Sequence, residues 1–236
     1  MRILAFDTSS VIASIAVVRD GITLAETETY VQAKHGEMLL PRIDSALKEA
    51  RVEFSEIDLV AVGLGPGSFT GIRVALATAK GFAIAAAKPF VGVNSLRVLA
   101  RGAIRGTCLV GTVVNAYRGE VYQALYGTDD QGRINELLMP THARPKEAAE
   151  RLLSASGGAP VCLCGDGARR YERQFFEVFG QSLDLADPAA DRIRAANLSF
   201  EAERILKEIG PSDLTATEPL YLRPSDAQPP KQALRI

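Results

Sequence analysis

Histidine and cysteine, which supply many metal sites and reactive thiols, are scarce in this sequence. The two histidines, His35 and His142, are too few for a multi-histidine metal site, and we expect both at the surface. The cysteines are Cys108, Cys162 and Cys164, and the Cys-Leu-Cys spacing of the last two lacks the Cys-x-x-Cys pattern of zinc and redox sites. We therefore expect the cysteines to be small core residues in a reducing compartment.

An excess of charge of either sign is also missing. The formal net charge is −1 and the pI is about 6.2, so the basic field typical of nucleic-acid binders is not present. The first residues reach the carboxylate of Asp7 after too few apolar positions for a signal peptide, and no uncharged run of 18 apolar residues predicts a membrane span. Apolar residues at 47% are typical of a folded domain. The composition predicts a soluble, cytoplasmic protein.

The hydrophobic pattern predicts an α/β protein built from two similar halves. In the first half we expect strands at 3–6, 12–18, 22–29, 57–63 and 90–93, and helices at 36–50, 72–87 and 95–103. In the second half we expect strands at 108–114, 120–126 and 161–164, and helices at 146–154, 169–179 and 195–209. A strand followed by an Asp turn opens the first half, and a strand followed by an Asn turn opens the second. The repeat predicts a duplicated two-domain fold with mixed sheets flanked by helices.

The expected domains are 1–103 and 104–222, with a boundary near Arg101 and a flexible tail at 223–236. Helix 195–209 is compatible with packing on either half, including a return to the N-terminal domain. The chain from Pro211 onward is rich in proline, and we expect it to be frayed or extended.

The glycine-rich segment 63–71 follows a predicted strand and opens a predicted helix, where backbone N–H groups can hold an anion. Its spacing fails the dinucleotide fingerprint, because no acidic residue stands between the loop and Glu120. It also fails the phosphate-loop pattern, because Gly71 is followed by Ile72 and Arg73. The other interpretation is a tight turn that lets the strand and the helix pack closely.

The helix after this loop has small residues at every fourth position: Gly71, Ala75, Ala79, Ala83 and Ala87. Residues four apart lie one above another on a helix, so this strip allows another helix to approach closely. Two interpretations remain open, packing inside the monomer and contact with another protein. The amphipathic helix at 37–50 is the expected neighbour in either case.

These features together resemble the TsaB (YeaZ) family of the actin/Hsp70/sugar-kinase superfamily. The resemblance is carried by the turn at 6–9, the run 65–73 with 77–81, and the segments 35–41, 94–96, 118–122 and 219–223. It covers nearly the whole chain, and the run 65–73 is the most specific part of it.

The resemblance implies an accessory subunit without a catalytic, cofactor or metal site of its own. Such a subunit binds and activates a TsaD-like paralogue that makes N6-threonylcarbamoyladenosine at position 37 of tRNAs reading ANN codons. A TsaE-like ATPase joins the pair, tRNA is reached only through the complex, no membrane is involved, and the subunit forms a homodimer when alone. Pairing is expected through helices 37–50 and 72–87. The implied interface residues are Leu39, Leu40, Ile43, Leu47, Gly71, Arg73, Ala75, Ala79 and Ala83.

The sequence departs from its catalytic relatives at two places. In TsaD proteins a His-x-x-x-His pair holds the metal, and here the second histidine position is Leu39. At the second strand turn Asn115 replaces the usual carboxylate, and a neutral amide is a poorer ligand for a hard cation. The turns are therefore interpreted as remnants of a nucleotide site, formed by Asp7, Thr8, Ser9 and Asn115. The alternative function is an autonomous ATPase or metallopeptidase-like hydrolase of the same superfamily.

Overall fold

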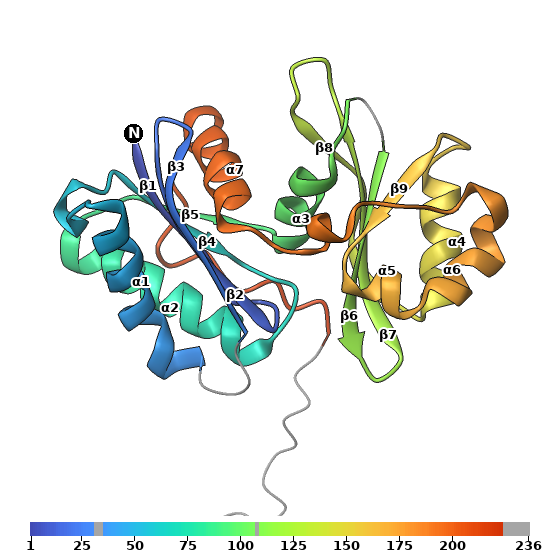
Figure 1. The fold of residues 1–236 in the computed structure, drawn as a ribbon, viewed down its shortest axis with the longest axis horizontal. Coiled ribbons are helices and arrows are strands. Elements are labelled where there is room, and N and C mark those ends of the chain that lie inside the picture. Colours follow the sequence, from blue (N-terminus) through green and yellow to red (C-terminus); the bar gives the residue numbers. More distant parts are fainter. Residues whose placement is uncertain (31–34, 107–108, 224–236) are drawn as a thin grey trace, which may run out of the picture.

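The computed structural model describes residues 1–30, 35–106 and 109–223. Two five-stranded mixed sheets face each other across the centre of the molecule (Figure 1). Cys108 lies outside the described residues. Of the predicted tail at 223–236, only residue 223 is described.

Both sheets have the same topology. The first has the order β3 (Ile22–Tyr30), β2 (Ile12–Arg19), β1 (Arg2–Asp7), β4 (Leu59–Gly63) and β5 (Phe90–Val93). The second has the order β8 (Ile134–Ala143), β7 (Glu120–Thr128), β6 (Leu109–Tyr117), β9 (Val161–Cys164) and β10 (Asp184–Leu185). In each sheet three antiparallel strands are followed by two strands that run parallel to the first. The predicted duplication is confirmed.

The helices also correspond in the two halves. In the first half they are α1 (His35–Ala50), α2 (Phe69–Ala86) and α3 (Ser95–Ala103), with a 3₁₀ turn η1 (Phe54–Glu56). In the second half they are α4 (Pro145–Ala155), α5 (Asp166–Arg170), α6 (Glu172–Phe179) and α7 (Ala195–Glu208), with 3₁₀ turns η2 (Gly180–Ser182) and η3 (Pro188–Asp191). α1 and α2 cover the outer face of the first sheet, and α4 and α6 cover the outer face of the second (Figure 1).

The inner faces of the sheets are covered by exchanged helices. α3 comes from the first half of the chain and packs on the second sheet, whereas α7 comes from the second half and packs on the first. We call the first sheet with α1, α2 and α7 the first lobe, and the second sheet with α3 to α6 the second lobe. One continuous apolar cluster joins them, from Ala5 on β1 through Leu99 and Leu198 to Tyr126 on β7.

A few predicted boundaries are wrong. The expected strand 57–63 begins at Leu59, after η1, and the expected helix 169–179 is divided into α5 and α6 at Tyr171. β8 was not predicted, because it is an edge strand with only two of its ten residues buried and therefore lacks a strong apolar pattern. β10 was not predicted either, since it has only two residues. The segment after Pro211 is not frayed, because Ser212 and Leu220 donate backbone hydrogen bonds to the first lobe.

Among the described residues, α2 is long and apolar enough by length and composition to cross a membrane. It carries Arg73 and Lys80, and it packs along the first sheet through Gly71, Ile72, Ala75, Leu76 and Ala79. Length and composition alone are weak evidence for a membrane span in a helix that packs on a sheet in this way.

Candidate functional site: two occupied turns and an exposed helical face

The first strand turn is closed by its own side chains. Asp7 ends β1 and is buried, with Oδ1 accepting hydrogen bonds from the Ser9 N–H at 2.7 Å and the Ser9 hydroxyl at 2.6 Å. Its Oδ2 accepts from the Ser95 hydroxyl at 2.5 Å, and that hydroxyl also accepts from the Gly65 N–H. Burial raises the pKa of the Asp7 carboxyl above its usual value, against the opposing effect of these hydrogen bonds. The carboxyl therefore organises this turn from inside the protein.

The glycine-rich loop packs directly on this turn. The Ser68 N–H donates to the Ser9 carbonyl at 2.6 Å, and the Thr8 hydroxyl donates to the Gly71 carbonyl at 2.7 Å. A Cβ atom on Gly71 would lie 1.9 Å from the Thr8 carbonyl oxygen. A Cβ atom on Gly67 would lie 2.0 Å from the Ser9 carbonyl oxygen. The two glycines thus allow backbone to lie on backbone, which is the close packing that one interpretation of the loop predicted.

The second strand turn is also occupied by a carboxylate. Asn115 lies within β6, beyond the predicted end of that strand, and its N–H donates to Asp166 Oδ1 at 2.9 Å. Its own side-chain oxygen accepts from the Tyr117 N–H at 3.1 Å. Gly167 permits the close approach, because a Cβ atom there would lie 2.9 Å from the Val114 carbonyl carbon. Burial raises the pKa of Asp166.

The two turns therefore share one arrangement. The N–H groups of Ser9 and Asn115 each donate to a carboxylate of the chain. A phosphate that bound to these two N–H groups would have to displace the carboxyl groups of Asp7 and Asp166. Within the described part of the chain, no three His, Cys, Asp or Glu side chains come close enough to hold a metal.

Two of the positions that the family resemblance relates to a metal site are His35 and Leu39. Leu39 is 2% exposed and packs in the apolar core beneath α1. The side chain of His35, at the first residue of α1, lies outside the described residues. His142 lies on β8 opposite Tyr122, far along the chain from this helix.

The predicted pairing residues are mostly inside the monomer. Six of the nine are buried between the helices and the first sheet: Leu39, Ile43, Leu47, Gly71, Ala75 and Ala79. These six side chains do not reach the surface of the monomer, because the small-residue strip of α2 and the apolar side of α1 both face the first sheet, and their part in pairing stays a prediction. Leu40 is 54% exposed, Arg73 is exposed and Ala83 is half-buried.

A different stripe of α2 faces solvent. Only five of its 18 residues are buried, although the helix is strongly apolar. The exposed stripe consists of Phe69, Arg73, Ala77, Gly81 and Ile84. The side chains in the middle of the stripe are small, and the space there is open, because a Cβ atom on Gly81 would have nothing within 4 Å. The far end of the stripe carries Ile84, which is 70% exposed. We call this stripe the α2 face. An apolar helix exposed in this way is typical of a contact surface for another protein.

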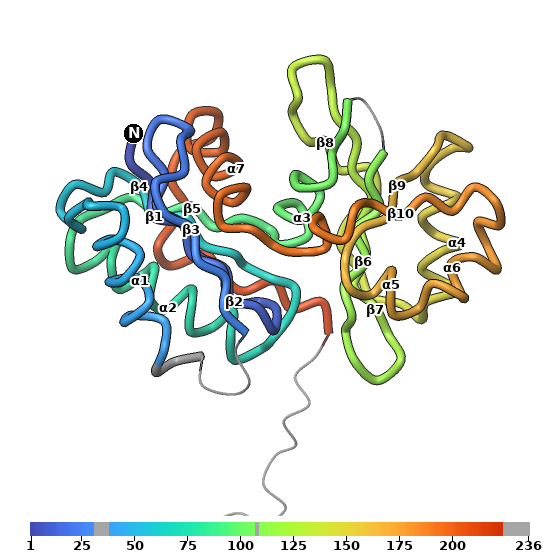
Figure 2. The backbone as a smooth tube through the Cα atoms, in the orientation of Figure 1, coloured from blue at the N-terminus to red at the C-terminus, as the bar shows by residue number. Residues whose placement is uncertain are grey.

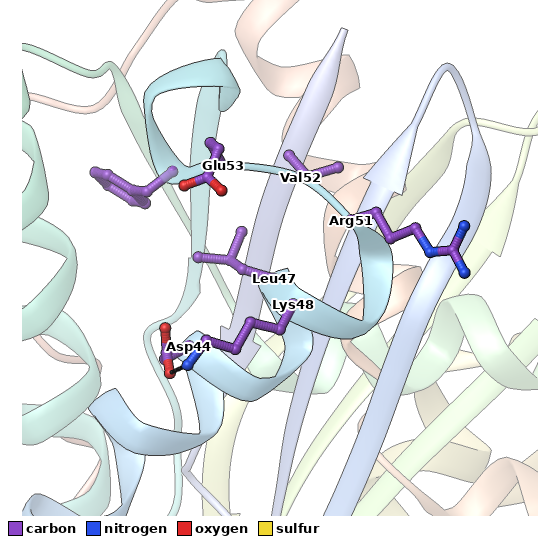
Figure 3. A pocket seen from close by; sticks show the side chains of 7 residues that line it. Asp44, Leu47, Lys48, Arg51, Val52 and Glu53 are labelled. Carbon is purple, nitrogen blue, oxygen red and sulfur yellow. Dashed lines mark hydrogen bonds and ion pairs between the residues drawn. The ribbon is translucent and has the colours of Figure 1, made fainter.

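A separate pocket of about 310 Å³ lies beyond the C-terminal end of α1 (Figure 3). Leu47 and Val52 form apolar parts of its wall, and Asp44 and Lys48 form an ion pair at 2.6 Å. Because Glu53 and Arg51 add one further charge of each sign, the pocket has no excess charge to select an anion or a cation. It does not contact the strand turns.

Comparisons with known proteins identify the family and the fold of this chain. A family model described as TsaD, tRNA N6-adenosine threonylcarbamoyltransferase, matches residues 28–148. The tRNA threonylcarbamoyladenosine biosynthesis protein TsaB of Haemophilus influenzae is 33% identical over 94% of each chain. The solved structure of YeaZ from Pseudomonas aeruginosa matches with a TM-score of 0.80 at 28% identity, over 94% of this chain and 99% of that one.

More distant structures show the fold alone. The ROK hexokinase of Thermus thermophilus has a TM-score of 0.54 at 15% identity, over 88% of this chain and all of the hexokinase. The duplicated sheets thus have the actin/Hsp70-like architecture. With the length and identity of the matches above, the chain belongs to the TsaB (YeaZ) family of tRNA threonylcarbamoyladenosine biosynthesis proteins.

Proposed function

We propose that this protein is a non-catalytic subunit that binds a TsaD-like paralogue through the α2 face and activates it. The partner would carry out formation of N6-threonylcarbamoyladenosine at position 37 of ANN-decoding tRNAs. The observation that supports this most is the exposure of α2, an apolar helix of which five of 18 residues are buried in the monomer. Family membership supplies the reaction in which the pair takes part.

The shape of the α2 face favours a helix as the contacting element. Ala77 and Gly81 occupy its middle, and their small side chains allow another helix axis to approach to about 8–10 Å. Arg73 at one end adds a charge-assisted donor, and Leu40 on α1 adds an exposed apolar group nearby in the helical layer. Such small, apolar centres with polar margins are common in specific interfaces.

The same face would serve a homodimer when the partner is missing. Because one α2 face cannot contact two proteins at once, homodimer and heterodimer would be mutually exclusive. We further propose that a TsaE-like ATPase joins the heterodimer, that tRNA is reached only through the complex, and that the assembly is cytoplasmic.

The absence of catalysis in this chain is part of the proposal. Its support is that Asp7 and Asp166 occupy the N–H donors of the two strand turns. Calorimetric titration with ATP and Mg²⁺ tests it, and we expect no low-micromolar site. A tight, Mg²⁺-dependent site with turnover would instead favour the alternative function, an autonomous hydrolase.

Ala77→Arg tests the pairing surface. The variant places a long charged side chain in the centre of the α2 face, and burial of an unpaired charge costs several kcal/mol. Since each 1.4 kcal/mol is about a tenfold change in affinity, binding should weaken by two orders of magnitude or more. The measurement is co-elution with the TsaD-like partner in size-exclusion chromatography.

Ser154→Arg is the matched control, because Ser154 is an exposed helical residue on α4 of the second lobe. Both variants should keep the cooperative thermal transition of the unmodified protein. If Ala77→Arg still co-elutes with the partner at low micromolar concentration, the α2 face is not the interface.

A further inference from the structure

The last described segment, residues 212–223, runs as a strap along the first lobe, with a hydrogen-bonded turn at residues 213–217. At its start the Ser212 N–H donates to the Phe90 carbonyl at 2.8 Å, and the Ser212 hydroxyl accepts from the Gly92 N–H at 3.0 Å. Further on, the Leu220 N–H donates to the Leu64 carbonyl at 2.8 Å. These bonds tie the strap to the ends of β4 and β5, close to the glycine-rich loop.

Next, the strap contacts the α2 face. The Tyr221 hydroxyl accepts a hydrogen bond from Arg73 Nε at 2.6 Å, and its ring centroid lies 4.9 Å from that of Phe69. The Arg73 guanidinium carbon lies 3.8 Å from the centre of the Phe69 ring. Tyr221, 148 residues after Arg73, thus holds a residue of the proposed pairing surface in place.

At its end the strap crosses to the second lobe. Arg223 Nη1 donates to the Ala116 carbonyl at 3.1 Å and lies 3.4 Å from Glu120 Oε2. Ala116 and Glu120 belong to β6 and β7, on either side of the turn that joins them. Figure 2 shows the red end of the described chain leaving the first lobe and ending beside β6.

The hairpin reached by Arg223 contains a strained turn. Tyr117 has φ of 60° and Arg118 has φ of 54°, in the left-handed region that side chains other than glycine seldom adopt. Such a conformation persists when surrounding contacts hold it. The Arg223 hydrogen bond to Ala116, directly before the turn, is one of these contacts.

We propose that residues 212–223 form a latch that couples the α2 face to the β6–β7 hairpin. Only one residue separates Tyr221 from Arg223, and an extended chain spans at most about 3.6 Å per residue, so the backbone at these two positions cannot move far independently. Displacement of Tyr221 from Arg73 therefore moves Arg223 away from the hairpin. The latch is a property of the isolated chain, and it does not depend on the proposed pairing function.

Hydrogen–deuterium exchange of the full-length chain without any partner tests the latch. In Arg223→Ala, amides of residues 115–121 should exchange at least about threefold faster, because a hydrogen bond that holds the turn is lost. In Arg73→Ala, which changes only α2, the same residues and the strap should also exchange faster. Tyr221→Phe removes only the hydroxyl acceptor and should give a smaller increase in the same two places.

Two controls separate coupling from general destabilisation. Thr70→Ala changes another exposed side chain in the first turn of α2, and Arg173→Ala changes an exposed side chain on α6. Both should leave residues 115–121 and 212–222 unchanged. The proposal is overturned if Arg73→Ala leaves the hairpin unchanged, whether or not the strap itself responds. It is also overturned if Arg223→Ala leaves the hairpin unchanged.

Discussion

Replacing Gly71 by alanine should destabilise the protein strongly, although alanine is the better helix former. The added Cβ atom would lie 1.9 Å from the Thr8 carbonyl oxygen, and ordinary contact begins near 3.4 Å, so the backbone must move by about 1.5 Å. Such a shift breaks the Thr8–Gly71 and Ser68–Ser9 hydrogen bonds, each worth about 1 kcal/mol. Overpacking adds about 1–3 kcal/mol, and the expected loss is therefore about 3–5 kcal/mol.

Gly81→Ala is the matched control, because it makes the same substitution ten residues later in the same helix. A Cβ atom at Gly81 would meet nothing within 4 Å, so only helix propensity acts, and it should stabilise the protein by up to about 1 kcal/mol. Urea unfolding followed by circular dichroism measures both changes. If Gly71→Ala is as stable as the unmodified protein, the loop does not rest on the Asp7 turn as described.

Three further predictions concern buried groups. The side chain of Glu201 is 0% exposed and pairs with Arg97 at 2.7 Å and with Arg101 at 2.6 Å. Glu201→Ala should therefore lower the free energy of unfolding in urea by about 3–5 kcal/mol. As the control on the same helix, Glu203→Gln should lower it by less than about 1 kcal/mol. Ala79→Arg should abolish the cooperative thermal transition because Ala79 is fully buried; a melt like that of the unmodified protein would contradict this. Burial raises the pKa of Asp7 in the folded state, so the folded protein binds this proton more tightly than the unfolded chain does. The stability that comes from this proton is fully present below the usual carboxyl pKa and is lost as pH rises through the pKa of the folded state. Asp7→Asn cannot ionise and should remove that part of the decline in stability as pH rises above the usual carboxyl pKa, and an unchanged pH profile would show that Asp7 is not its source.

The buried elements of the fold were predictable because their patterns are local. β1, β4 and β9 are short apolar runs between turn residues, and α1 repeats its apolar side chains at three and four residues. The duplicated order of elements follows from these patterns. An exposed edge strand such as β8 leaves no comparable pattern, since few of its side chains are buried.

The occupied turns were predictable only in part. The family resemblance led to the prediction that Asp7 and Asn115 are remnants of a nucleotide site. Their internal partners, Ser95 and Asp166, lie 88 and 51 residues away, and hydrogen bonds over such separations have no signature in sequence spacing. The contact of Arg73 with Tyr221, 148 residues apart, was missed for the same reason.

The sequence alone determined the family, the two-lobed α/β plan and the small, apolar character of α2. It did not determine which side of α2 faces outward. Gly71, Ala75 and Ala79 repeat with a period of four, and so do Ala77 and Gly81. Helical periodicity is identical for both stripes, and only the position of the first sheet buries one and leaves the other exposed. The tertiary structure decided which stripe of α2 is exposed, because burial depends on what packs against a helix as well as on its own pattern.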